Sequence, residues 1–111
     1  MTQRTLETET EIQSSILSAL RQLPGVWLPM PTGRGKVKGK KGFIKFGTKG
    51  MADIMGLLPN GRTLFLEVKT ATGVQSEDQI AFQERMKELG HEYAVVRSVD
   101  EALDFVTEAG R

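Results

Sequence analysis

The sequence predicts one small α/β domain, residues 1–111, in which helices flank a mixed sheet of four to five strands. Three features predict this fold class. Apolar residues recur at helical spacing near both ends of the chain. Two apolar runs in the middle are separated by Pro59-Asn60-Gly61, which is typical turn chemistry. A helical segment then connects the second run to another apolar run, which is the pattern of a crossover between parallel neighbouring strands.

A first helix is expected over Thr2–Leu23, ending at Pro24-Gly25. Its apolar residues recur with the helical period: Ile12, Ile16, Leu20 and Leu23. Glu9 lies one turn before the first of these and projects from the same face, whereas Glu7 and Glu11 point elsewhere. For those two we expect a favourable interaction with the positive end of the helix. For Glu9 that role and a role at a site on the sheet both stay open, because an inward-facing acid needs a partner.

A short strand is expected over Val26–Met30, with Trp27 packed in the core rather than stacked on a nucleic-acid base. Residues 32–50 follow with six of the twelve glycines and seven of the fifteen Lys and Arg. Residues 43–46 are expected to form a brief strand within this segment. No Asp or Glu occurs from Ile12 to Ala52, so the charge asymmetry favours a face that binds a polyanion. We expect contacts to the DNA backbone, with a solvated loop as the alternative, from Arg34, Lys36, Lys38, Lys40, Lys41, Lys45 and Lys49.

Composition restricts the class of protein further. Hydrophobic residues make up 39% of the chain and charged residues 26%, as in an ordinary soluble domain. The absence of cysteine excludes disulfides and thiolate zinc sites, and the single histidine, His91, argues against an HNH-type or zinc-dependent site. No apolar run is long enough to span a membrane, and the acidic N-terminal region is unlike a signal peptide. We therefore expect an intracellular, cytoplasmic protein without membrane contact, small enough to gain stability from dimerisation.

The central hairpin and the C-terminal half supply the remaining elements. Two strands are expected over Met51–Leu58 and Thr63–Lys69, and a third over Glu92–Arg97, parallel to the second. One helix should begin at Ser76 and end near Leu89, before Gly90. Another should begin at Ser98 and end near Ala109, with an inward face made by Ala102, Leu103, Val106 and Ala109.

Both of these helices begin with the pattern of a capping box, Ser76-Glu77-Asp78-Gln79 and Ser98-Val99-Asp100-Glu101. Gln79 also shares a helix face with Phe82, Met86 and Leu89, the face that should pack on the sheet. At that inner edge its amide could hydrogen-bond a lysine or a water molecule. We favour this active-site role for Gln79 over capping alone.

The hairpin places three functional side chains together. A three-residue loop, with Gly61 in the left-handed conformation, pairs Leu58 with Arg62 and sets Asp53 opposite Glu67. A two-residue loop would pair Ile54 with Glu67 instead and turn Asp53 to the other face. Lys69 shares a face with Glu67, because side chains two apart on a strand point the same way. Two carboxylates and an ammonium group at one site suit Mg²⁺- or Mn²⁺-dependent phosphodiester hydrolysis.

This pattern resembles the PD-(D/E)xK nuclease superfamily. Asp53 and Glu67-Val68-Lys69 match its motif, although Met51-Ala52 stands where the superfamily name has a proline. The following Gly73-x-x-Ser76-x-x-Gln79 resembles the VRR-NUC branch in its short stand-alone phage form, over about residues 9–98. The predicted fold is then a small restriction-endonuclease-like domain.

The resemblance implies an Mg²⁺- or Mn²⁺-dependent endonuclease. Asp53, Glu67, the Val68 carbonyl and Glu9 would hold the metal, and Lys69 and Gln79 would assist. It also implies a homodimer that acts on structured DNA, such as Holliday junctions or flaps, in phage replication or repair. The alternative is a non-catalytic basic DNA-binding module, and a restriction-type enzyme would need base-reading elements that do not stand out here.

Overall fold

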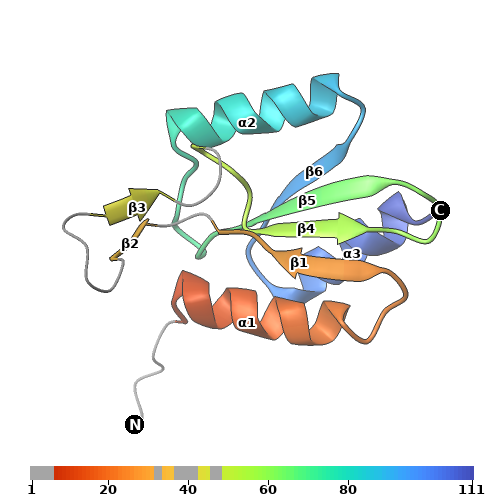
Figure 1. Ribbon diagram of the computed structural model, residues 1–111. Helices are drawn as coiled ribbons and strands as arrows, with labels where there is room; N and C mark the ends of the chain where they lie inside the picture. Colours follow the sequence, from red (N-terminus) through yellow and green to blue (C-terminus); the bar gives the residue numbers. More distant parts are fainter. Residues whose placement is uncertain (1–6, 32–33, 37–42, 46–48) are drawn as a thin grey trace, which may run out of the picture.

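The computed structural model describes residues 7–31, 34–36, 43–45 and 49–111 and shows three layers (Figure 1). The middle layer is a sheet with the strand order β1 (Val26–Pro29), β4 (Ile54–Leu57), β5 (Thr63–Val68) and β6 (Glu92–Val96). One face is covered by helix α2 (Glu77–Glu88), and the other by helices α1 (Glu9–Leu20) and α3 (Val99–Ala109). The predicted small α/β fold with a four-stranded mixed sheet is confirmed.

The central hairpin has the predicted register. Strands β4 and β5 pair antiparallel with Ile54 opposite Leu66 and Leu57 opposite Thr63, so the count continues to Asp53 opposite Glu67. The loop has three residues, because the Leu58 N–H donates to the Arg62 carbonyl at 2.9 Å. Gly61 has a φ of 86°, the left-handed conformation that this loop requires. Strands β5 and β6 are parallel neighbours, as the crossover predicted.

The main core lies between the sheet and the two helices α1 and α3. Its fully buried members include Ile16 and Leu20 of α1 and Leu64 and Leu66 of β5. Trp27 is buried, as predicted, and lies over Gly56, where an added Cβ would come within 2.5 Å of the indole ring. Glycine at this position therefore lets the aromatic ring pack directly on the neighbouring strand.

The first helix is shorter than predicted. It begins at Glu9 with Thr8 as N-cap, and Thr8 and Glu11 form a reciprocal capping box. A capped helix begins where a side chain satisfies its first free N–H groups, so the apolar period alone placed the start too early. The predicted helical residues before residue 7 lie outside the described part of the chain.

Helix α2 makes a thinner layer on the opposite face. None of its residues is fully buried, and Phe82 and Met86 pack partly buried against a small cluster formed by Ala52, Phe65 and Tyr93. The Ser76 capping box is confirmed. The expectation that Leu89 faces the sheet is wrong: it is the C-cap residue and is exposed. The chain reverses at Gly90, with a φ of 90°, and the His91 N–H donates to the Met86 carbonyl, as in a Schellman motif.

Helix α3 is fixed at both ends. The Ser98 side chain caps its N-terminus, but the predicted capping box is incomplete, because the Glu101 carboxylate accepts from the N–H of Arg97 rather than of Ser98. At the C-terminus, the side chains of Asn60 and Arg62 donate to the Ala109 carbonyl. The hairpin tip thus satisfies a free carbonyl of the helix end.

A small two-stranded sheet extends from one end of the molecule (Figure 1). It consists of β2 (Arg34–Lys36) and β3 (Phe43–Lys45), paired antiparallel. The predicted brief strand is thus present, and it pairs outside the main sheet. Lys38, Lys40, Lys41 and Phe46 lie outside the described residues. None of the helices within the described ranges is long and apolar enough to cross a membrane.

Candidate active site

Glu67 is the centre of the candidate site. It lies on β5 on the face covered by α2, and its side chain is completely buried. The Tyr93 hydroxyl on the neighbouring strand β6 donates to Glu67 Oε1 at 2.6 Å. The second oxygen, Oε2, is buried and has no hydrogen-bond partner among the described residues. A buried carboxylate oxygen without a partner is energetically costly, so it marks a place where a further ligand would bind favourably.

Lys69 provides a positive charge beside this oxygen. Its Nζ atom lies 3.8 Å from Glu67 Oε2, and the side chain is 10% exposed. This distance is too long for a hydrogen bond but short enough for a strong electrostatic interaction in a buried site. The Glu-x-Lys triplet therefore forms a buried ion pair in which Glu67 Oε2 faces the Lys69 ammonium group without a hydrogen bond.

Asp53 reaches the same site from the start of β4. Its Oδ2 atom accepts a hydrogen bond of 2.7 Å from the Val68 N–H. Burial raises the pKa of Asp53 most; the Val68 hydrogen bond lowers it, and the negative charges of Glu67 and Glu9 raise it further. The net shift is upward, so the protonated form is favoured relative to an exposed aspartate. A divalent cation would reverse this effect, because it favours the ionised form.

The Val68 carbonyl faces the Asp53 side of the strand. The N–H and C=O groups of one strand residue point to the same side, and successive residues alternate. The Lys69 N–H donates to Val96 of β6, whereas the Val68 N–H donates to Asp53. The Val68 carbonyl is therefore directed away from β6, toward the end of β4 at which Asp53 lies.

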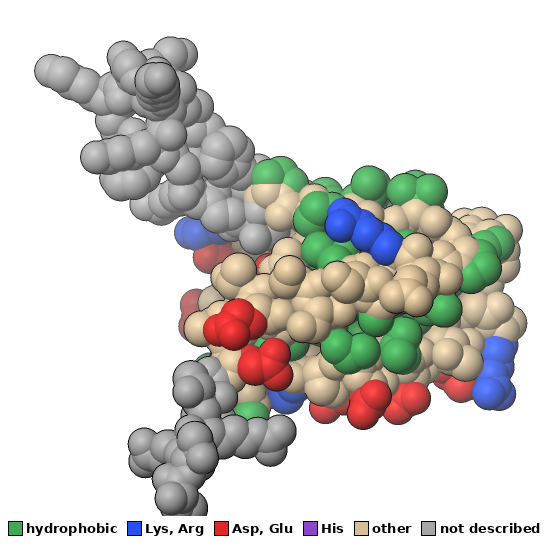
Figure 2. Space-filling model, turned by 90° about the horizontal axis from the view of Figure 1, so that it is seen from below, with side chains coloured by type: hydrophobic (Ala, Val, Ile, Leu, Met, Phe, Trp, Pro, Cys, Tyr) green, Lys and Arg blue, Asp and Glu red, His purple; other side chains and the backbone are tan. Residues whose placement is uncertain are grey.

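Glu9 lies at the N-terminus of α1 and is exposed. Its negative charge contributes to the raised pKa of Asp53. No group of three His, Asp or Glu side chains within the described ranges is close enough to hold a metal ion. The role of Glu9 as a ligand stays a prediction. Several acidic side chains are exposed on the face of the molecule seen in Figure 2.

The structure shows Gln79 as a capping residue. Its Oε1 atom accepts from the Ser76 N–H at 2.8 Å, and the Ser76 hydroxyl accepts from the Gln79 N–H. The catalytic role of Gln79 stays a prediction.

Of the predicted DNA-binding side chains, Lys49 is exposed, and its Nζ atom lies 3.3 Å from Asp78 Oδ2. The backbones of Arg34, Lys36 and Lys45 lie on the β2–β3 arm.

Sequence reasoning missed two polar residues at the site. Tyr93 belongs to a predominantly apolar strand, and its hydroxyl donates to Glu67 Oε1. Burial, the hydrogen bond to Glu67 and the charges of Glu67 and Asp53 raise the pKa of this phenol, while a hydrogen bond with Gln75 lowers it. Gln75 also donates to Gln83 of α2 at 2.7 Å. The sequence signal was a single tyrosine in a strand that pairs with the Glu-x-Lys strand.

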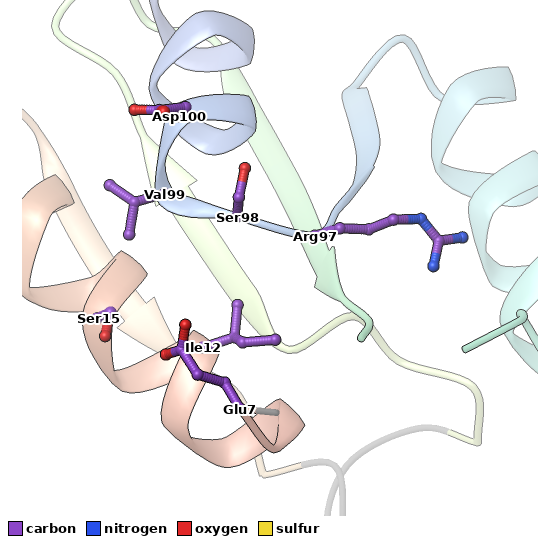
Figure 3. A pocket seen from close by; sticks show the side chains of 7 residues that line it. All are labelled: Glu7, Ile12, Ser15, Arg97, Ser98, Val99 and Asp100. Carbon is purple, nitrogen blue, oxygen red and sulfur yellow. The ribbon is translucent and has the colours of Figure 1, made fainter. Parts of the chain in front are cut away.

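A groove lies between α1 and the segment that leads into α3 (Figure 3). One part encloses about 260 Å³ and a second part about 310 Å³, and both are lined by Glu7, Ile12 and Arg97. The Arg97 side chain points away from Glu7 and donates to the carbonyls of Thr70 and Gly73. Arg97 therefore fixes the loop that follows Lys69, at one side of the candidate site.

Comparison with known proteins identifies the fold. No protein-family model and no curated protein matches the sequence. A solved structure described as a VRR_NUC domain superposes with a TM-score of 0.65 over 91% of this chain and 97% of that chain, at 20% sequence identity. The fold predicted from the resemblance is thereby confirmed, and the chain has the architecture of a VRR_NUC domain.

Proposed function

We propose that this protein is an Mg²⁺- or Mn²⁺-dependent endodeoxyribonuclease of the PD-(D/E)xK type. The observation that carries the proposal is the buried Glu67 Oε2, which has a lysine at 3.8 Å and no hydrogen-bond partner among the described residues. Asp53 lies opposite Glu67 in the extended register. The fold of a VRR_NUC domain supports the same reaction class.

The residues present fit a hard divalent cation. Glu67 Oε2, the Asp53 carboxylate and the Val68 carbonyl supply oxygen ligands, the type that Mg²⁺ and Mn²⁺ prefer. Glu9 would approach from α1 as a further acidic ligand or as support for the others. When bound, such a cation offsets phosphate charge and lowers the pKa of a coordinated water molecule.

Each side chain would then have a defined task in hydrolysis. A water oxygen attacks phosphorus and the water gives up a proton; the P–O bond to one sugar oxygen breaks, and that oxygen takes up a proton. Lys69 holds the attacking water and stabilises the added negative charge of the transition state. Asp53, fixed by the Val68 N–H, and Glu67 would together hold the cation that offsets the charge of the phosphate oxygens. Gln79, at the start of α2, assists by a hydrogen bond to Lys69 or the water.

The proposed substrate is branched DNA in the host cytoplasm during phage replication or repair. The basic residues of the 32–50 segment would bind phosphates, because Lys and Arg gain from counterion release at the DNA backbone. The β2–β3 arm extends from the edge of the molecule that carries the start of α2 (Figure 1). A bound DNA strand could therefore contact the arm while its backbone lies against the end of the molecule at which α2 begins.

A cleavage panel tests the proposal. Linear, splayed, flap and four-way DNA would be incubated with the protein in Mn²⁺, in Mg²⁺ and in EDTA. We expect cleavage of branched DNA with either metal and none in EDTA or by Glu67→Gln. Arg111→Gln is the matched control, because Arg111 is exposed and pairs with Glu108 at the C-terminal end. DNA binding in EDTA without cleavage in either metal would identify a binding module instead.

The proposal includes a homodimer, since two-fold symmetry would direct two sites at opposite strands of a branched substrate. We propose Phe43 and Ile44 of the arm for the interface, together with Phe46, which lies outside the described residues. Light scattering at micromolar concentration should give twice the chain mass of 12.3 kDa. A monomer mass would contradict junction resolution and leave nicking as the activity.

A further inference from the structure

Tyr93 contacts the candidate catalytic carboxylate directly and has no part in the mechanism described above. It lies on β6 opposite Phe65, on the same face of the sheet as Glu67, and only 7% of it is exposed. Its hydroxyl donates to Glu67 Oε1 at 2.6 Å. A hydrogen bond to a buried ionised acceptor is short and about twice as strong as a neutral one.

This hydrogen bond gives the two Glu67 carboxylate oxygens different environments. Oε1 is held by the phenol, and Oε2 is left beside Lys69. The phenol is itself held in place by packing, because its ring lies against Phe82 of α2 with centroids 6.3 Å apart. Helix α2 therefore positions the ring whose hydroxyl holds Glu67 Oε1.

We propose that Tyr93 is a positioning residue, which fixes the Glu67 carboxylate so that Oε2 is presented to a divalent cation and to Lys69. The proposal rests on the metal-dependent function proposed above. Without the hydroxyl, Oε1 would lose its partner, and the carboxylate would rotate or bind Lys69 with both oxygens. Groups that orient a metal ligand in this way change metal affinity by about 10- to 100-fold when they are removed.

The test is a double-mutant cycle on Mn²⁺ affinity, measured by calorimetry without DNA. We expect Tyr93→Phe to weaken Mn²⁺ binding by about 10- to 100-fold while the circular dichroism spectrum stays unchanged. In a Glu67→Gln background the same substitution should change the affinity less than about twofold, because the residue through which Tyr93 acts is gone. Phe82→Leu is the packing control: it removes a ring contact with Tyr93 but no hydroxyl, and should leave Mn²⁺ affinity within about twofold.

A spectroscopic readout follows from the composition, because Tyr93 is the single tyrosine. Its ultraviolet resonance Raman doublet should report a strong hydrogen-bond donor in the wild type, with and without Mn²⁺, and a weaker donor in Glu67→Gln. Wild-type Mn²⁺ affinity in Tyr93→Phe, or an equal loss in both backgrounds, would overturn the positioning role alone. A wild-type protein that binds no Mn²⁺ would overturn the proposed function and this inference with it.

Discussion

Asp53→Asn should make the metal-free protein more stable while it removes the response to metal. In the wild type, burial and the negative charges of Glu67 and Glu9 act against the Asp53 carboxylate, as its raised pKa shows. Asparagine removes that charge, and its Oδ1 atom can still accept the 2.7 Å hydrogen bond from the Val68 N–H. Single substitutions that relieve an unfavourable interaction commonly add about 0.5–2 kcal/mol to the free energy of unfolding. For a domain of this size, about 1 kcal/mol corresponds to a rise in Tm of roughly 4 °C.

The pH dependence has a definite sign. The folded-state pKa of Asp53 is above its ordinary value of 3.8, so the cost of the charge is complete above the folded pKa and disappears as the pH falls toward 3.8. The stability advantage of Asp53→Asn should therefore be present at pH 7 and shrink in that acidic window. Asp104→Asn, on the exposed face of α3, is the matched control and should change stability by less than about 0.5 kcal/mol.

Divalent metal should reverse the order of stability. At a concentration of about 100 times Kd, a ligand that binds only the folded state adds about 2.7 kcal/mol. Wild-type protein in Mn²⁺ should then melt roughly 10 °C higher than in EDTA. The Tm of Asp53→Asn should be the same in both buffers. Thermal melts of both proteins in both buffers test this. A variant less stable than wild type in EDTA at pH 7, or one with the full Mn²⁺ response, would refute the reasoning.

Three further predictions concern the elements around the site. Glu9→Gln should lower metal-dependent cleavage by about a hundredfold with DNA binding intact. Glu11→Gln should be nearly silent, because glutamine also completes a capping box. If rate assays show the reverse order, Glu11 and not Glu9 is the acid of the site. Gly50→Ala should lower the free energy of unfolding by about 2 kcal/mol or more, since its φ is 78° and an added Cβ would lie 2.1 Å from the Asp78 carbonyl oxygen. Gly61→Ala, with φ 86° but open space around it, should cost only about 1 kcal/mol when both variants are compared by urea titration. Equal losses in the two variants would mean that the contact with Asp78 does not matter. Four lysines of the basic segment would be neutralised together: Lys36, Lys38, Lys40 and Lys41. The slope of log K for DNA binding against log salt concentration should then flatten by about 0.9 per lost phosphate contact. An unchanged slope would exclude the basic segment from the DNA interface.

Much of the fold is predictable from local sequence patterns such as turn residues and helix caps. Pro59-Asn60-Gly61 determined the loop length, and the loop length determined that Ile54 pairs with Leu66. The Ser76 capping box and Gly90 located both ends of α2 within a residue or two. These elements were predictable because each depends on residues within a few positions of one another.

The errors and omissions have two causes. The partner of the Glu101 carboxylate and the exposure of Leu89 depend on the backbone geometry at a helix end, which the residue types alone do not determine. The contact between Tyr93 and Glu67 depends on how distant segments meet in space. Tyr93 and Glu67 are 26 residues apart, and no periodicity links them. A tyrosine in an apolar strand fits burial as well as a polar role, since its ring is apolar and only its hydroxyl needs a partner. The site's supporting hydrogen bonds were therefore not predictable from the sequence.

The hairpin register connects stability to the candidate chemistry. In β4 and β5 the residues on one face, such as Ile54, Leu66 and Val68, are buried in the main core with α1 and α3. The residues on the other face include Glu67, beneath the thinner layer of α2. A slip of one residue would exchange the two faces and place the carboxylate of Glu67 in the apolar core, where an unpaired charge is strongly unfavourable. The apolar core that stabilises the fold thus also selects the register that brings Asp53 opposite Glu67, although the turn that sets this register lies at the far end of the hairpin.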